Sequence, residues 1–229
     1  MRIWSLLLAC CVAAFMAAAT EESLPPKTHP DSSGWENLFA EDLSNAVGSK
    51  EAWSFKDGVW TPSEDKYIWT QKQYENFILD LEFKMAKGGN SGVFIYCSDL
   101  EKWLTRSLEV QLFEDHDAKD KKPASSNCGG IYGRLPPKKI ASKPAGEWNR
   151  LTITCLGKKI YVLLNGEQVV EMDLSLWTSA EKNPDGSDVP KWIKELPPCE
   201  LPTKGHVGLQ GKHGGVPVHF RNIKIKELK

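Results

Sequence analysis

Apolar and polar residues alternate with a period of two along much of the chain. The clearest case is residues 77–85, where apolar side chains from Phe77 to Met85 take every second position and Asp80, Glu82 and Lys84 lie between them. Such alternation predicts a strand with one buried face and one polar face. The same pattern predicts further strands at residues 93–97, 108–113, 151–155, 160–164, 168–172 and 218–225.

The segments between these strands carry residues that favour tight turns. Asn165-Gly166 is a strong signal for a two-residue hairpin, and Gly88-Gly89 lies just before Asn90 in another turn. No segment shows the period of an amphipathic helix of ordinary length. Many short strands joined by hairpins predict an all-β fold, an antiparallel β-sandwich or jelly roll, because a single sheet would leave its apolar face in water.

The first residues predict a cleaved export signal. Arg2 is followed by an apolar run and then by an A-x-A cleavage site at Ala17 and Ala19. We therefore interpret residues 1–19 as a Sec signal peptide and expect the protein to be secreted or periplasmic. A lipoprotein box at residues 7–10 is the lesser alternative, because cleavage there would leave a very short apolar segment. No other stretch is apolar enough to span a bilayer.

Composition divides the remaining chain into a leader and one domain. Residues 20–33 form a polar leader, and residues 34–229 are expected to form a single jelly-roll domain. Within that domain, residues 174–204 are rich in proline and lack alternation. We expect an irregular insertion there that is either a lid or a packed surface loop.

Charge and residue counts exclude some partners and leave other questions open. The chain has 29 Lys and Arg against 30 Asp and Glu, so no basic field favours nucleic acid as the main partner. Nine tryptophans are unusually many, and each either packs in the core or offers a face to a sugar ring. Beyond the signal peptide, four cysteines permit two disulfides of undetermined pairing: Cys97, Cys128, Cys155 and Cys199.

The strand predicted at residues 108–113 carries the first candidate site. Leu108, Val110 and Leu112 share one face, so Glu109 and Gln111 share the other. If that outer face is concave, a carboxyl, an amide and neighbouring aromatic rings would hold a sugar; the alternative is a solvated face without a ligand. 

His213 is the second candidate, in a glycine-rich connection before the last strand. Its imidazole would transfer a proton or bind a metal, or else simply hydrogen-bond to the turn backbone.

Residues 109–114 also resemble the E-x-D-x-x-E strand of laminarinase-like retaining glycosidases. Here Gln111 stands where that motif has aspartate. Without a β-bulge, Glu114 also points away from the face that carries Glu109, so the two carboxyls cannot flank one glycosidic bond. The sequence therefore disfavours a retaining hydrolase that uses two carboxylates.

A second resemblance rests on several motifs in a fixed order. They are residues 90–94 (NSGVF), 108–111 (LEVQ), 130–133 (GIYG), 143–149 (KPAGEWN), 164–166 (LNG), 205–210 (GHVGLQ), 213–214 (HG) and 220–223 (FRNI). Together they resemble the 3-keto-disaccharide hydrolase domain family, over a region from about Gly34 to the C-terminus.

This resemblance implies an exported bacterial domain of concanavalin A-like or LamG-like jelly-roll fold that cleaves 3-keto-glycosides. A ketone at C3 makes the C2 proton acidic, so the bond from C1 to the leaving oxygen can break by elimination or hydrolysis with one base and one carbonyl polariser. The implied base is Glu109 or His213, and the implied donors to the keto sugar are Gln111 and Arg221. Tyr96 and Tyr132 would line the site, and Asn90 and Ser91 match the family's N-S-G turn.

Cofactor and class stay open at this point. A divalent metal holding the enediolate fits the chemistry, but the sequence shows no diagnostic ligand spacing and makes no cofactor certain. The expected partner is an oligosaccharide or glycoside substrate. The alternatives are a non-catalytic carbohydrate-binding module and a conventional laminarinase-like glycan hydrolase.

Overall fold

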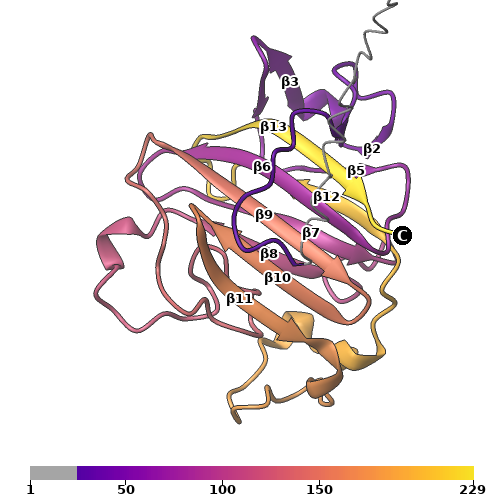
Figure 1. Cartoon of the computed structure of the whole chain (residues 1–229), viewed down its shortest axis with the longest axis vertical. Helices are drawn as coiled ribbons and strands as arrows, with labels where there is room; N and C mark the ends of the chain where they lie inside the picture. Colours follow the sequence, from indigo (N-terminus) through magenta and orange to yellow (C-terminus); the bar gives the residue numbers. More distant parts are fainter. Residues whose placement is uncertain (1–24) are drawn as a thin grey trace, which may run out of the picture.

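The computed structural model describes residues 25–229, and within them the chain forms two antiparallel sheets (Figure 1). The predicted signal peptide, and with it the prediction of export, lies outside the described residues. The larger sheet has the order β11-β10-β9-β6-β13-β4-β3, with β1 paired to β13, and the smaller sheet has the order β2-β5-β12-β7-β8.

The larger sheet comprises β1 (Glu36–Asn37), β3 (Trp53–Lys56), β4 (Val59–Pro62), β6 (Phe77–Met85), β9 (Trp148–Leu156), β10 (Lys159–Leu164), β11 (Glu167–Asp173) and β13 (Val218–Glu227). The smaller sheet comprises β2 (Ala46–Gly48), β5 (Tyr67–Thr70), β7 (Asn90–Cys97), β8 (Leu108–Phe113) and β12 (His206–Gln210). Short 3-10 helices are η1 (Lys50–Ala52), η2 (His116–Ala118), η3 (Leu174–Leu176), η4 (Lys191–Ile193) and η5 (Pro198–Glu200).

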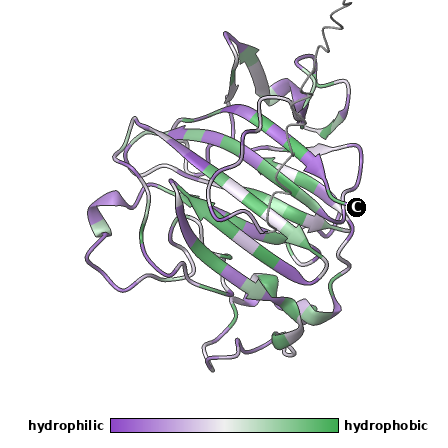
Figure 2. Ribbon diagram, in the orientation of Figure 1, coloured by the Kyte–Doolittle hydropathy of each residue, from purple (hydrophilic) through white to green (hydrophobic). Residues whose placement is uncertain are grey.

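The core lies between the two sheets, as the alternation predicts. Phe83 and Leu81 of β6 are at most 1% exposed, as are Val93 of β7 and Val110 of β8. These side chains belong to one continuous apolar cluster, and apolar and polar positions alternate along the strands in Figure 2. The two sheets hide each other's apolar faces, so the fold is the predicted antiparallel jelly-roll sandwich.

One β-bulge breaks the alternation in β7. Phe94 pairs with Gly208 of β12 and Cys97 pairs with His206, so two residues of β7 oppose one of β12 between those pairs. Tyr96 takes a left-handed backbone conformation there, with φ of 57°, and its side chain is fully buried in the core. Simple alternation along residues 93–97 would place Tyr96 on the same face as Phe94, but the extra residue reverses the parity and turns Tyr96 into the core.

Two irregular segments pack against the sandwich. Residues 174–204 hold η3, η4 and η5 and bury Leu174 and Leu201 against the core. At the other end, residues 29–33 of the predicted leader cross the outer face of the larger sheet, where Ser32 donates to the buried carboxylate of Asp80. In Figure 1 this indigo segment runs in front of β9.

The four cysteines of the described region are all free, so the two disulfides that the count permits are not formed here. Across residues 25–229, no helix is both long and apolar enough to cross a membrane.

Candidate active site

The outer face of the smaller sheet is hollowed by a cavity of about 380 Å³. Because Leu108, Val110 and Leu112 of β8 point into the core, Glu109 and Gln111 point to this face. Other strands add to the lining, and so do the loops. The lining residues are Tyr67, Asn90, Phe94, Trp103, Leu104, Glu109, Gln111, Tyr132, Trp192, Gln210 and His213.

The carboxyl of Glu109 lies over the neighbouring strand, above Gly92. A Cβ atom at position 92 would collide with this carboxyl, so glycine leaves the space that it occupies. Burial raises the pKa of Glu109 to about 8, and within the described chain its carboxyl makes no hydrogen bond or ion pair. A carboxyl without a partner in an apolar wall holds its proton at neutral pH and is a candidate proton donor.

His213 lies at the same cavity and is oriented by an aspartate. Its Nδ1 is 2.7 Å from Oδ2 of Asp65, and its backbone N–H donates to the carbonyl of Asn90. An ionised carboxylate can only accept, so Nδ1 carries the proton and Nε2 keeps a lone pair. The imidazole can therefore accept a proton at Nε2.

Asp65 also connects His213 to the other side chains of the cavity. Nε2 of Gln210 donates to Asp65 at 3.2 Å and to the hydroxyl of Tyr67 at 2.9 Å. Burial raises the pKa of Tyr67 above its ordinary value, with a further contribution from the Asp65 charge. Since its oxygen accepts from Gln210, the Tyr67 hydroxyl keeps its proton available to donate to a ligand.

Gln111 fixes a second amide on the same face. Its Nε2 donates to Oδ1 of Asn90 at 2.8 Å, and Gln111 is only 3% exposed. Because Oδ1 of Asn90 already accepts this hydrogen bond, the amide N–H groups of Asn90 remain available to donate to a ligand.

Aromatic rings form the wall near β5 and β7. The ring of Trp103 lies 4.4 Å from Tyr67 and 5.2 Å from Phe94, centroid to centroid. Trp69 of β5 lies behind them, 5.5 Å from Phe94. These rings form an apolar cluster separate from the main core, and such a wall suits the apolar face of a sugar ring.

The loop after β8 brings Tyr132 beside Glu109. The Tyr132 backbone N–H donates to the carbonyl of Glu109 at 2.9 Å, and Gly130 and Gly129 continue this pairing along Gln111. The loop thus acts as a short extra strand at the edge of the smaller sheet.

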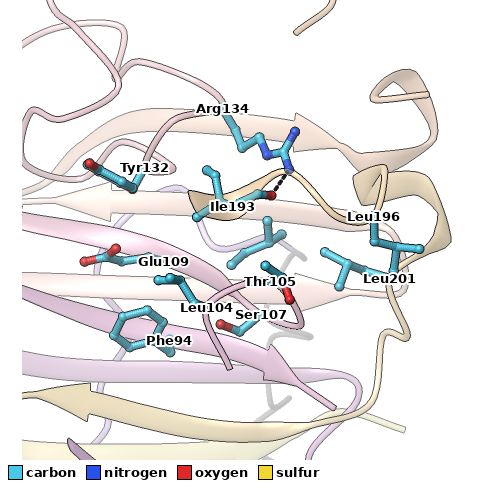
Figure 3. Close-up of a pocket in the computed structure, with 11 residues that line it drawn as sticks. Phe94, Leu104, Thr105, Ser107, Glu109, Tyr132, Arg134, Ile193, Leu196 and Leu201 are labelled. Carbon is cyan, nitrogen blue, oxygen red and sulfur yellow. Dashed lines mark hydrogen bonds between the residues drawn. The ribbon is translucent and has the colours of Figure 1, made fainter. Parts of the chain in front are cut away.

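A smaller cavity of about 20 Å³ adjoins the same carboxyl (Figure 3). Glu109 and Tyr132 line both cavities, whereas Arg134 and Ile193 line the smaller one. Arg134 is 6% exposed, and its Nη2 donates to the carbonyl of Ile193 at 3.1 Å. Burial lowers the pKa of this guanidinium to about 10. The irregular insertion at residues 174–204, for which the sequence predicts a lid or a packed surface loop, therefore borders the site.

Two side chains that the family resemblance assigned to the site lie elsewhere. Tyr96 is buried between the sheets, where its hydroxyl donates to the carbonyl of Gly157 at 2.7 Å. Arg221 lies on β13 in the larger sheet, pairs with Glu82 and stacks 4.1 Å from the ring of Trp148. A donor role for Arg221 toward a sugar in this cavity is therefore wrong.

Ser91 has a structural place rather than a position in the cavity lining. It is fully buried, and its hydroxyl donates to the Gln210 carbonyl at 2.8 Å, which joins β7 to β12. Glu109, Gln111, His213, Tyr132 and Asn90 are the predicted site residues that the structure brings together.

The second carboxyl of the laminarinase-like pattern lies outside the cavity lining. Glu114 follows β8 and accepts the backbone N–H of Gly88 at 3.1 Å. Glu109 is the one carboxyl among the described residues that line the cavity, so the arrangement lacks the pair that a retaining glycosidase needs.

A metal held by protein side chains alone does not fit. Among residues 25–229, no three His, Cys, Asp or Glu side chains gather as ligands.

Several lining residues were not predicted, although one carried a usable signal. Tyr67-Ile68-Trp69 alternates aromatic and apolar residues and could have been read as a short strand with an aromatic face. Trp192 lies in an irregular segment, where no period predicts the direction of a side chain.

Comparison with known proteins decides the family. A family model described as the 3-keto-alpha-glucoside-1,2-lyase-like domain matches residues 32–226. The chain belongs to this family. The match contains both sheets except Glu227, the last residue of β13, and every residue of the cavity lining.

Individual relatives agree with this assignment. A 3-keto-disaccharide hydrolase from Bacteroides thetaiotaomicron is 30% identical over 176 residues, which cover 68% of this chain and 60% of that protein. The chain thus matches less than two thirds of its relative's length. The crystal structure of a candidate glycosyl hydrolase from Parabacteroides distasonis is 49% identical, with a TM-score of 0.80, covering 85% of this chain and 99% of that one.

A more distant likeness concerns the fold alone. The carbohydrate-binding module CBM66 from Bacillus subtilis is 10% identical with a TM-score of 0.50, covering 82% of this chain and 99% of that chain.

Proposed function

We propose that the protein cleaves 3-keto-glycosides at the bond between C1 and the leaving oxygen, by elimination followed by addition of water. The observation that carries the proposal is the pairing, in one cavity, of a protonated carboxyl at Glu109 with an imidazole at His213 that Asp65 orients. The family, and the relative named as a 3-keto-disaccharide hydrolase, support the same class of substrate.

In the first step, His213 removes the proton from C2 of the keto sugar. The ketone at C3 makes this proton acidic, and Nε2 of His213 is the free acceptor because Nδ1 faces Asp65. The electron pair of the C2–H bond forms a C2–C3 double bond, and the C3 oxygen becomes an enolate. Asp65 then stabilises the imidazolium that results.

The enolate oxygen needs hydrogen-bond donors that are already in place. Tyr67 and Asn90 supply them, because each has its oxygen engaged by a neighbouring amide and its hydrogens left over. The raised pKa of Tyr67 keeps this donor protonated. Donors fixed before the reaction stabilise the developing charge without reorganising, which is where most of such rate enhancement arises.

In the second step, Glu109 gives its proton to the leaving oxygen. The enolate collapses to the ketone, a C1–C2 double bond forms, and the C1–O bond breaks as the leaving group departs as an alcohol. The hydroxyl of a water molecule then adds at C1 while the second proton of that water returns to the Glu109 carboxylate, and the proton on His213 returns to C2, so the net reaction is hydrolysis and both residues are restored. The pKa of about 8 keeps Glu109 protonated at neutral pH, and turnover should decline as the pH rises above that value.

The runner-up is a carbohydrate-binding module without catalysis. The aromatic wall of Tyr67, Phe94 and Trp103 favours it, since such walls bind sugars passively. An inert binder, however, has no use for an unpaired carboxyl with a raised pKa, which costs stability.

The test incubates the protein with a 3-keto-disaccharide and with the same disaccharide unoxidised, and follows release of the leaving sugar. We expect turnover of the oxidised substrate, with kcat reduced roughly 10²–10⁴-fold in Glu109→Gln and in His213→Gln. Arg221→Gln is the matched control, since Arg221 lies on the other sheet and should leave kcat unchanged. Binding of both sugars without turnover would establish the runner-up instead, and turnover of the unoxidised sugar would overturn both.

A further inference from the structure

Trp192 is exposed at the rim of the cavity. Its residue is 56% exposed, and it lies on η4 (Lys191–Ile193). Over the described residues, the exposed large apolar side chains are Leu104, Leu176 and Trp192, and two of these three line the cavity. Large apolar surface beside a cavity is characteristic of a binding surface.

The backbone that carries Trp192 is held from both sides. Arg134 donates to the carbonyl of Ile193, and Lys194 pairs with Glu181. A Cβ atom at Gly133 would collide with Pro190 and Ile193, so the turn packs directly against the Tyr132 loop. An aromatic ring on a fixed turn is ordered before a ligand arrives, which reduces the entropy cost of binding.

The Trp192 ring differs from the ring of Trp103, which lines the same cavity, in its aromatic contacts. Trp103 contacts Tyr67, Phe94 and Trp69. Trp192 takes part in no ring stacking or cation–π contact anywhere in residues 25–229. Its indole can therefore stack with a ring from outside the protein.

Trp192 also lies nearer to Glu109 than to His213 along the lining of the two cavities. Its neighbour Ile193 lines the smaller cavity together with Glu109 (Figure 3). His213 lines only the larger cavity. A leaving group that accepts the proton of Glu109 thus extends toward η4, while the keto ring lies toward His213.

We propose that Trp192 is the platform on which the sugar ring of the leaving group stacks, so that this residue sets the preference for a sugar over a small leaving group. This rests on the proposed function for the reaction, but the platform itself rests on the exposure of Trp192 at the cavity, on the fixed turn and on a ring that no other ring of residues 25–229 stacks against. The flat C–H face of a pyranose would stack on the indole, whereas a methyl leaving group is too small to reach across it.

The test compares kcat/KM for a 3-keto-disaccharide and for the methyl 3-keto-glucoside. In Trp192→Ala, we expect about a tenfold loss on the disaccharide and less than about a twofold change on the methyl compound. Trp192→Phe should keep most of the disaccharide rate. Leu176→Ala is the matched control, because Leu176 is 63% exposed but lines no part of the cavity. Equal losses on both substrates, or no loss on either, would overturn the platform.

A binding measurement separates failure of the platform from failure of the reaction. If the unaltered protein turns over neither substrate, the reaction is wrong, and calorimetry with the unoxidised disaccharide and methyl glucoside still judges the platform. Weaker binding of the disaccharide alone in Trp192→Ala would support it. Affinities in Trp192→Ala equal to those of the unaltered protein would contradict the platform role of Trp192.

Discussion

Glu109 is a carboxyl that folding places where its charge is unfavourable. Its pKa of about 8 arises from burial alone, because no cation lies close enough to offset the loss of water. Gly92 contributes by leaving the space above its strand to this side chain. A residue kept at such a cost is expected to serve function rather than stability.

The first prediction concerns the stability of Glu109→Gln. An unfolded glutamate ionises near pH 4.5, whereas Glu109 in the folded protein ionises near pH 8. Between these values the unfolded state releases its proton first, so the free energy of unfolding falls as the pH rises and levels off above about pH 8. The glutamine variant lacks this loss and should be more stable at pH 8 by a few kcal/mol at most, roughly.

Urea unfolding of both proteins at pH 4.5, 6.5 and 8.5 measures this difference. The difference in the free energy of unfolding between Glu109→Gln and the unaltered protein should be near zero at the lowest pH and largest at the highest. Glu147→Gln, at an exposed glutamate, is the control, and its free energy of unfolding should equal that of the unaltered protein at all three pH values. Parallel curves for Glu109→Gln and the unaltered protein would mean that Glu109 ionises normally.

At the scale of the strand, alternation identifies long strands well and fails where pairing shifts. Residues 77–85 and 108–113 are predicted with the bounds of β6 and β8. The five short strands β1 to β5 were not predicted, because two to four residues carry too little periodicity to distinguish a strand from a loop.

The candidate site follows the same division. Glu109 and Gln111 share a face because no bulge interrupts β8, so local parity was sufficient to group them. The prediction that Tyr96 lines the site could not account for the bulge in β7, because that bulge depends on pairing with β12, which is more than 100 residues away in sequence. The predicted position of Arg221 in the site does not match the structure, because alternation gives the face of a strand to which a side chain points but not the sheet to which the strand belongs.

The second prediction concerns the turn that carries Trp192. Arg134→Met keeps the apolar stem and removes the donor to Ile193, while Nη1 of Arg134 has no partner in the described chain to lose. Replacing a buried, incompletely paired cation by an apolar side chain is often neutral or stabilising. We therefore expect an unchanged or higher free energy of unfolding together with faster amide hydrogen exchange over residues 190–196.

The same variant should lose part of the preference for a disaccharide over the methyl 3-keto-glucoside. A purely structural role would not change that ratio. Arg106→Met is the comparison, because Arg106 pairs with Glu195 in the same region but lines neither cavity. If exchange and preference both stay unchanged in Arg134→Met, the turn is held by packing alone.

At the scale of the whole molecule, the sandwich separates two polar surfaces by one apolar core. The cavity lies on the outer face of the smaller sheet, and the segment at residues 29–33 lies on the outer face of the larger one. Beneath that segment, Asp80 is 2% exposed and accepts from Ser32, Thr152 and Arg150. A buried carboxylate with this many donors fastens the segment to the sheet.

The third prediction follows from this separation. Removing residues 1–33 takes away the hydroxyl of Ser32, the carbonyl of Pro30 that accepts from Arg150, and the His29 contacts with Thr152 and Gly166. About four hydrogen bonds at roughly 1 kcal/mol each are lost, and Asp80 is left exposed, so the free energy of unfolding should fall by about 2–4 kcal/mol.

The rate on a 3-keto-disaccharide should not change at temperatures where the protein stays folded, because none of these groups reaches the cavity on the other sheet. Removing only residues 1–24 retains every one of these contacts and is the control. A shortened protein that keeps its urea midpoint but loses activity would show that the leader acts on the site, and that the two faces are coupled through the core.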